Sequence, residues 1–149
     1  MVLQKYYYEY DEFKDDVKAL DKLVAPFGAD TFVAIARGGM TLGHFLAQRI
    51  DTRRLYTINS IHYEKEKKLD SFEICNIPNL DDANKVLLLD DIVDSGETVA
   101  EILQILQSKY PQIEFKIATI FYKPTAMIQP DFSLKQAHQW IDFFWEVDV

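Results

Sequence analysis

A short segment around residue 90 brings together side chains that could bind a phosphorylated sugar. Two adjacent carboxylates, Asp90 and Asp91, follow the apolar run 86–89, which is long enough for a strand buried on both faces. Residues 94–98, Asp-Ser-Gly-Glu-Thr, then form a glycine-bearing loop that opens into a helical pattern. A helix N-terminus offers N–H groups and a positive dipole to a phosphate, and hydroxyl side chains add donors. In an ordinary turn, one side-chain oxygen caps the helix, and this role would account for one of the acidic or hydroxyl residues but not for three carboxylates around a glycine.

Two more groups of this kind follow other apolar runs. Arg37-Gly38-Gly39 comes directly after the run 31–36, and two glycines after an arginine suit a tight turn whose amides face a diphosphate. Taken alone, this group also fits an ordinary turn with a surface arginine. Lys123 follows the run 115–122 and precedes a proline, which cannot continue a strand ladder.

The elements that must position these groups alternate along the chain. Strands are expected at 5–8, 31–36, 54–60, 85–90 and 115–122, and helices at 11–25, 41–49 and from 98 to about 109. Asp11 is the expected N-cap of the first helix. This alternation predicts an α/β fold with a parallel sheet covered on both faces, and ligands then bind outside the carboxyl ends of the strands. All the polar groups described above fall at such ends.

Composition limits the classes of protein that this chain could be. Its 149 residues contain no repeat or linker, which predicts a single domain over residues 1–149. No stretch approaches the roughly 20 apolar residues of a membrane span, and the first residues do not predict a signal peptide. Cys75 is the only cysteine, so an intramolecular disulfide is excluded and the cytoplasm is the expected compartment. The net charge of −8 argues against nucleic acid as a partner, whereas a magnesium-chelated pyrophosphate can sit among carboxylates.

These motifs resemble those of type I phosphoribosyltransferases. In that family a buried strand, two acids and Asp-Ser/Thr-Gly-x-Thr form the loop that binds phosphoribosyl pyrophosphate (PRPP). The resemblance implies that the PRPP-binding residues are Asp90, Asp91, Asp94, Ser95, Gly96, Glu97 and Thr98. It places Asp94 at the position of the proposed catalytic base. Arg37 and Gly38 match the pyrophosphate loop, and in the family the peptide entering this arginine can be cis. The implied fold is a parallel sheet flanked by helices, with a small hood built from the chain termini.

The resemblance is narrower at the residues expected to bind the base. Purine-specific members use the lysine at the position of Lys123 to donate to the 6-oxo group. Bacterial xanthine–guanine phosphoribosyltransferases carry Trp-Ile-x-x-x-Trp-Asp near the C-terminus, which is similar to residues 140–146 here. This implies that Trp140 stacks on the purine and that the Ile141 carbonyl faces its 2-position. The other aromatic residues of this segment, Phe143, Phe144 and Trp145, are expected in the core.

The metal ligands implied by the resemblance are carboxylates that would bind Mg2+. They are Asp90, Asp91 and Glu146. The chain departs from the family at Glu146, where the relatives have aspartate, and whether this longer side chain contacts a second Mg2+ is left open.

The connection between residues 60 and 76 contains the charge run 64–68, which is typical of a solvated hairpin. In the family this position holds a mobile loop with Ser-Tyr near its start, and this chain has His62-Tyr63. Tyr63 matches the tyrosine of the family's Ser-Tyr pair. The histidine either replaces the serine as a donor or is simply exposed.

The resemblance thus implies transfer of the phosphoribosyl group from PRPP to a purine base. The expected acceptors are guanine, xanthine and hypoxanthine, which the sequence does not rank, and the products are the nucleoside 5′-monophosphate and pyrophosphate. A homodimer or homotetramer is expected from the family. Two alternatives remain, a nucleotide-sensing regulator of the same fold that binds RNA or DNA, and a pyrimidine or orotate phosphoribosyltransferase.

Overall fold

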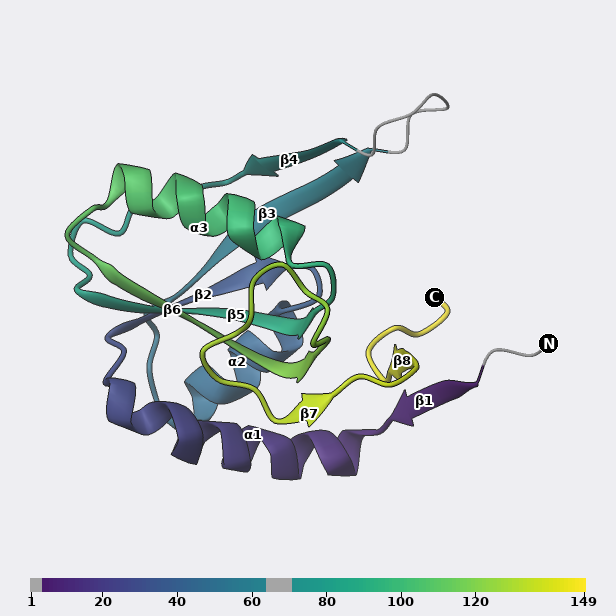
Figure 1. Cartoon of the computed structure of the whole chain (residues 1–149). Coiled ribbons are helices and arrows are strands. Elements are labelled where there is room, and N and C mark those ends of the chain that lie inside the picture. The colour runs from purple at the N-terminus through teal and green to yellow at the C-terminus, as the bar shows by residue number, and fades with distance from the viewer. Residues whose placement is uncertain (1–3, 64–70) are drawn as a thin grey trace.

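The computed structural model describes residues 4–63 and 71–149, so the charge run at 64–68 lies outside the described residues. Figure 1 shows a central sheet with helices on both faces. The elements follow in the order β1 (Lys5–Tyr8), α1 (Tyr10–Val24), the 3-10 turn η1 (Ala25–Phe27), β2 (Thr31–Ala36), α2 (Met40–Arg49), β3 (Leu55–Tyr63), β4 (Ser71–Cys75), β5 (Lys85–Val93), α3 (Glu97–Lys109), β6 (Glu114–Tyr122), β7 (Lys135–Gln136) and β8 (Trp140–Phe143).

The main sheet has the strand order β4-β3-β2-β5-β6-β7, and its central strands are parallel as the sequence predicts. Alternate residues of β5 point to opposite faces. Leu87 and Leu89 pack in one apolar cluster with α1 and α2, and Val86 and Leu88 pack in a second cluster with α3. The sheet is therefore buried on both faces, with α3 on one side and α1 and α2 on the other (Figure 1). Among the described residues, none of the helices combines the length and apolar character that a membrane crossing requires.

Two local predictions were wrong. The first helix begins at Tyr10 with Glu9 at the N-cap position, and no side chain caps it, so Asp11 lies in the first turn and is not the N-cap. Strand β5 does not end at Asp90 but continues to Val93, because Ile92 and Val93 still pair with the neighbouring strand β6. The two acids thus lie inside the carboxyl-terminal part of the strand, not beyond it.

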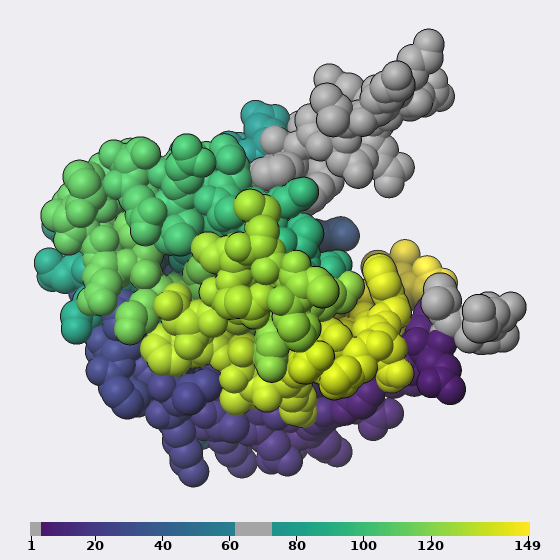
Figure 2. All heavy atoms as spheres, in the orientation of Figure 1, coloured from purple at the N-terminus to yellow at the C-terminus, as the bar shows by residue number. Residues whose placement is uncertain are grey.

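A second, two-stranded sheet joins the ends of the described chain. Strand β1 pairs in parallel with β8, with Lys5 opposite Trp140 and Tyr8 opposite Phe143. In the space-filling view, the purple N-terminal strand lies beside the yellow C-terminal segment (Figure 2). This pair of strands corresponds to the expected hood, and we use that name for β1 and β8 below.

Candidate active site

The loop after β2 lies directly against the acidic end of β5. A Cβ on Gly38 would lie 2.7 Å from a carboxylate oxygen of Asp91, and one on Gly39 would collide with the carbonyl oxygen of Leu89. Glycine is required at position 39 because the backbone of β5 approaches this closely, and a side chain at position 38 would displace the Asp91 carboxylate. The Ala36–Arg37 peptide that enters the loop is cis, as the family resemblance implied. The arrangement brings the predicted pyrophosphate loop next to one of the two predicted acids.

Asp90 and Asp91 share a crowded, poorly solvated site. The Asp91 N–H donates to Asp90 Oδ1 at 2.9 Å, and the Ile92 N–H donates to Asp91 Oδ1 at 2.7 Å. Burial and the neighbouring Asp91 charge raise the pKa of Asp90 well above its ordinary value, and burial also raises the pKa of Asp91. Two carboxylates held this way favour a cation beside them.

We expect Asp90→Asn to melt at a higher temperature than the wild-type chain at neutral pH without divalent cations. Because the pKa of Asp90 is raised above its ordinary 3.8, ionising it costs folding free energy at pH values above the raised pKa. Each kcal/mol of this cost corresponds to roughly 2–4 °C in a domain of this size. The cost vanishes as the pH falls through the raised pKa toward the unfolded value, so the two melting temperatures should converge there. Thermal unfolding followed by circular dichroism tests this, and equal values at neutral pH would contradict it.

The loop 94–97 leads from β5 into helix α3 and places the N-terminus of this helix at the same site. Gly96 is the N-cap residue of α3, with a φ of +85°, and a Cβ there would lie 2.9 Å from the Ile128 side chain. A side chain at this position is therefore excluded by both conformation and space. The Glu97 N–H donates to Ser95 Oγ at 3.3 Å, and the Met127 N–H donates to the Ser95 carbonyl at 2.8 Å. The segment after β6 thus braces the predicted phosphate loop.

Asp94 and Lys123 form an ion pair at the edge of this site. Lys123 Nζ lies 2.7 Å from Asp94 Oδ1, and the two side chains are 39% and 64% exposed. The Lys123 N–H donates to the carbonyl of Val93 at 3.0 Å, which fixes the lysine at the end of the main sheet. The predicted catalytic base, Asp94, and the predicted hydrogen-bond donor to the purine 6-oxo group, Lys123, are therefore neighbours. The pair offers one anionic acceptor and one cationic donor to a ligand, side by side.

A cavity of about 120 Å3 opens beside this ion pair. Its lining residues come from β5, the end of β6 and the C-terminal segment, and are Asp91, Ile92, Asp94, Lys123, Gln139, Trp140, Ile141, Phe143 and Glu146. Trp140 is 63% exposed, whereas Ile141 is buried in the hood. Phe143 is buried, and its ring stacks on that of Trp145 at 4.7 Å between centroids. Trp140 is thus the exposed aromatic of this segment that faces the cavity, and the other aromatics belong to the core, as expected.

Glu146 lies between the cavity beside Trp140 and the predicted pyrophosphate loop. It lines the cavity beside Trp140 and also a larger hollow of about 610 Å3 with Arg37 and Gly38. Burial and the charges of Asp91 and Asp142 raise the pKa of Glu146, and Arg37 partly offsets them. Among the described residues, no group of three or more His, Cys, Asp and Glu side chains is arranged to hold a metal ion.

Some of the site was missed from the sequence, and part of it is not described. Gln139 lines the cavity and Asp142 acts on Glu146, yet neither belongs to a motif, so only the fold could reveal them. His62 and Tyr63 end strand β3 and pair with Phe72 and Ser71 of the antiparallel strand β4, whereas the charge run expected in a solvated hairpin lies outside the described residues. Their side chains lie outside the described part of the chain, so the choice between the two roles of His62 stays open.

The chain is similar to known proteins along nearly its whole length. Residues 10–149 match the family described as the phosphoribosyl transferase domain. The xanthine-guanine phosphoribosyltransferase of Ruegeria sp. (strain TM1040) is 30% identical, over 95% of this chain and 85% of that protein. A Helicobacter pylori xanthine-guanine-hypoxanthine phosphoribosyltransferase structure is 40% identical with a TM-score of 0.91, over 97% of this chain and 96% of that one. The fold is also that of a purine phosphoribosyltransferase from Pyrococcus horikoshii Ot3, with a TM-score of 0.82 and 24% identity over 97% and 95% of the two chains.

Proposed function

The chain belongs to the phosphoribosyl transferase family, and we propose that it is a purine phosphoribosyltransferase that joins a 6-oxopurine to the ribose of PRPP. The Asp94–Lys123 ion pair beside the exposed ring of Trp140 is the observation that carries the proposal. A 6-oxopurine presents an acceptor oxygen at position 6 and, in one tautomer, an N–H at position 7. Lys123 donates to the oxygen and Asp94 accepts from the N–H, while Trp140 covers the ring.

PRPP binds across the ends of β2 and β5. The 5′-phosphate lies at the N-terminus of α3, where Ser95, Gly96, Glu97 and Thr98 surround it and the helix dipole favours its charge. Asp90 and Asp91 hold the ribose hydroxyls. Arg37 and the amide of Gly38 bind the pyrophosphate and neutralise the charge that develops as it leaves.

The carboxylates fit a Mg2+ ion that the family typically uses. Asp90 and Asp91 are two neighbouring oxygen donors with raised pKa values, and a cation would stabilise their ionised forms. Mg2+ is commonly held by one or two carboxylates together with substrate phosphates, which agrees with the lack of a three-residue cluster in the described chain. When bound, it would neutralise the leaving pyrophosphate. Glu146 lies on the pyrophosphate side, where it could meet a second ion.

The chemical step exchanges one bond at the anomeric carbon for another. The bond from C1′ to the pyrophosphate oxygen breaks, and N9 of the purine bonds to C1′ through an oxocarbenium-like state. Asp90 and Asp91 place negative charge near the developing cation. Asp94 takes the proton that the purine loses at N7, and Lys123 beside it stabilises the negative charge on the 6-oxo oxygen.

Steady-state kinetics with PRPP, Mg2+ and single bases test the proposal. We expect turnover with at least one of guanine, xanthine and hypoxanthine, and none with uracil or orotate. Turnover only with uracil or orotate would instead show a pyrimidine enzyme. Binding of RNA or DNA in a low-salt gel shift, without turnover of any base, would show a regulator. Cytoplasmic location and assembly into a dimer or tetramer stay predictions, and light scattering tests the second.

We expect Trp140→Leu to weaken purine binding without unfolding the chain. Trp140 is 63% exposed, so the substitution removes little core packing. Stacking of an aromatic side chain on a base contributes about 1–3 kcal/mol, which predicts a KM for guanine higher by roughly 5- to 150-fold. Guanosine monophosphate should also quench part of the tryptophan emission in the wild type, and this response should be lost in the variant.

Trp145→Phe is the matched control. Trp145 packs on Phe143 and Tyr8 in the core, so the variant should melt at a lower temperature and keep the quenching response. An unchanged KM in a destabilised Trp140→Leu protein would show that Trp140 is a packing residue.

A further inference from the structure

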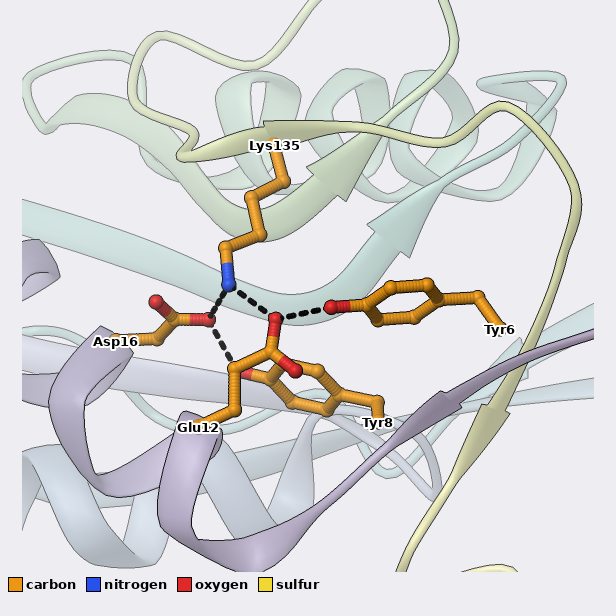
Figure 3. Close-up of polar contacts among 5 residues, drawn as sticks. All are labelled: Tyr6, Tyr8, Glu12, Asp16 and Lys135. Carbon is orange, nitrogen blue, oxygen red and sulfur yellow. Dashed lines mark hydrogen bonds and ion pairs between the residues drawn. The ribbon is translucent and has the colours of Figure 1, made fainter.

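A polar cluster joins β1 and the following helix α1 to strand β7, which lies more than 100 residues further along the chain (Figure 3). Lys135 of β7 lies between two acids of α1, with its Nζ 2.5 Å from Glu12 Oε1 and 2.8 Å from Asp16 Oδ2. From β1, the Tyr6 hydroxyl donates to the same Glu12 oxygen at 2.5 Å. The Tyr8 hydroxyl donates to the same Asp16 oxygen at 2.6 Å. None of these five residues lines the cavity beside Trp140, and the proposed mechanism uses none of them.

Burial and hydrogen bonding maintain both the protonation states and the geometry of this cluster. Asp16 is only 8% exposed and Tyr8 is 1% exposed, so each needs its partner inside the protein. Burial lowers the pKa of Lys135, but the hydrogen bonds to Asp16 and Glu12 and the negative charges of these two acids together raise it above its ordinary value, and the ammonium stays charged. Burial and the bond to Asp16 raise the pKa of Tyr8, so its hydroxyl stays a donor. Bonds that involve charged groups are the stronger and more directional ones.

The two halves of the purine site come from different sheets. Lys123 lies at the end of β6 in the main sheet, whereas Trp140 and Ile141 lie on β8 in the hood. Within residues 4–63 and 71–149, strand β8 pairs only with β1, and Tyr6 is the register partner of Ile141. The spacing between the lysine and the tryptophan therefore depends on how the hood is seated on the main domain.

The polar cluster attaches to α1 both β1 and the segment that precedes β8 in the sequence. Tyr6 and Tyr8 tie β1 to α1 through their hydroxyls, and Lys135 ties the same acids to the segment that leads, five residues later, into Trp140. Aromatic contacts also join the hood to the main sheet, such as Tyr8 with Phe121 at 5.2 Å between centroids. Those contacts add apolar area, whereas the hydrogen bonds and the ion pairs of the cluster hold β1 and β7 against the same two acids of α1.

We propose that Lys135, together with Glu12 and Asp16, is a positioning residue that seats the hood so that Trp140 and Ile141 face Lys123 across the purine. This inference rests on the proposed function, because it concerns affinity for the base. The residues that bind PRPP lie on β5, on the loop after β2 and at the start of α3, outside the hood. The cluster therefore controls the KM for the purine and leaves the KM for PRPP unchanged.

Tyr6→Phe is the mildest test, since it removes one hydroxyl and keeps the ring that packs on Phe121. Loss of one hydrogen bond to a charged group predicts a KM for guanine higher by roughly tenfold, with an unchanged KM for PRPP. Tyr7→Phe is the matched control, because Tyr7 is the next residue of the same strand and is 66% exposed. Neither KM should change in that variant.

Lys135→Met and Lys135→Arg test the charge itself. The methionine variant leaves Glu12 and Asp16 without their cation, so the KM for guanine should rise more than in Tyr6→Phe, and the arginine variant should recover most of the affinity. Melting temperatures on the same preparations report folding. An unchanged KM for guanine in Tyr6→Phe and Lys135→Met, or equal rises in both KM values, would overturn this inference alone. A wild-type chain that turns over no purine would overturn the proposed function and this inference with it.

Discussion

Asp94→Asn should reduce kcat by about 10²–10⁴-fold while changing the KM for PRPP little. The amide keeps the size of the side chain and can still accept a hydrogen bond from Lys123, which lies 2.7 Å from the carboxylate in the wild type. It cannot take a proton at neutral pH, so N9 must attack while the N7 proton is still in place. The loss therefore falls on the chemical step and not on substrate binding.

The side chain of Asp94 is 64% exposed, so its replacement should leave the melting temperature close to that of the wild type. Asp82→Asn is a suitable control, because it makes the same change at an exposed position outside the lining of the cavity. Initial rates over a range of PRPP and guanine concentrations separate kcat from both KM values. Near-normal turnover in Asp94→Asn would contradict the role of this residue as the base.

The local part of the site could be predicted because it is encoded in consecutive residues. A strand, two acids, a loop with one glycine and a helix are all contained in residues 86–109, and each step follows from short-range rules. The sequence predicts too early an end for β5, because Ile92 and Val93 owe their strand conformation to pairing with β6, more than twenty residues away. Local propensity does not contain that information.

The hood illustrates the same limit more strongly. Strand β1 was predicted, but its pairing with β8 joins residues more than 130 positions apart. The expectation of a hood came from the family resemblance and not from any pattern in these residues. Nothing in the sequence distinguishes Lys135, because an isolated lysine in a polar stretch is ordinarily exposed. Its role depends on two acids of α1 that only the folded chain brings near it.

Discrimination against adenine should be the largest effect measured with unmodified enzyme. Lys123 has only donors to offer, and adenine carries an amino group at position 6 where guanine carries an acceptor. Adenine therefore offers no acceptor at position 6 to the lysine, and sites that recognise a substrate through such a hydrogen bond reject analogues that lack it by about 10⁴-fold or more. The kcat/KM for adenine should therefore be about 10⁴-fold lower than the kcat/KM for guanine.

The variant Lys123→Gln shows whether the lysine is responsible. A glutamine amide offers both a donor and an acceptor, so it can pair with either base, and the preference for guanine should shrink mainly through a lower kcat/KM for guanine. A base that binds through Trp140 stacking alone would show comparable kcat/KM values for adenine and guanine already in the wild type. That result would remove Lys123 from the recognition of the 6-position, because stacking does not distinguish an oxygen from an amino group.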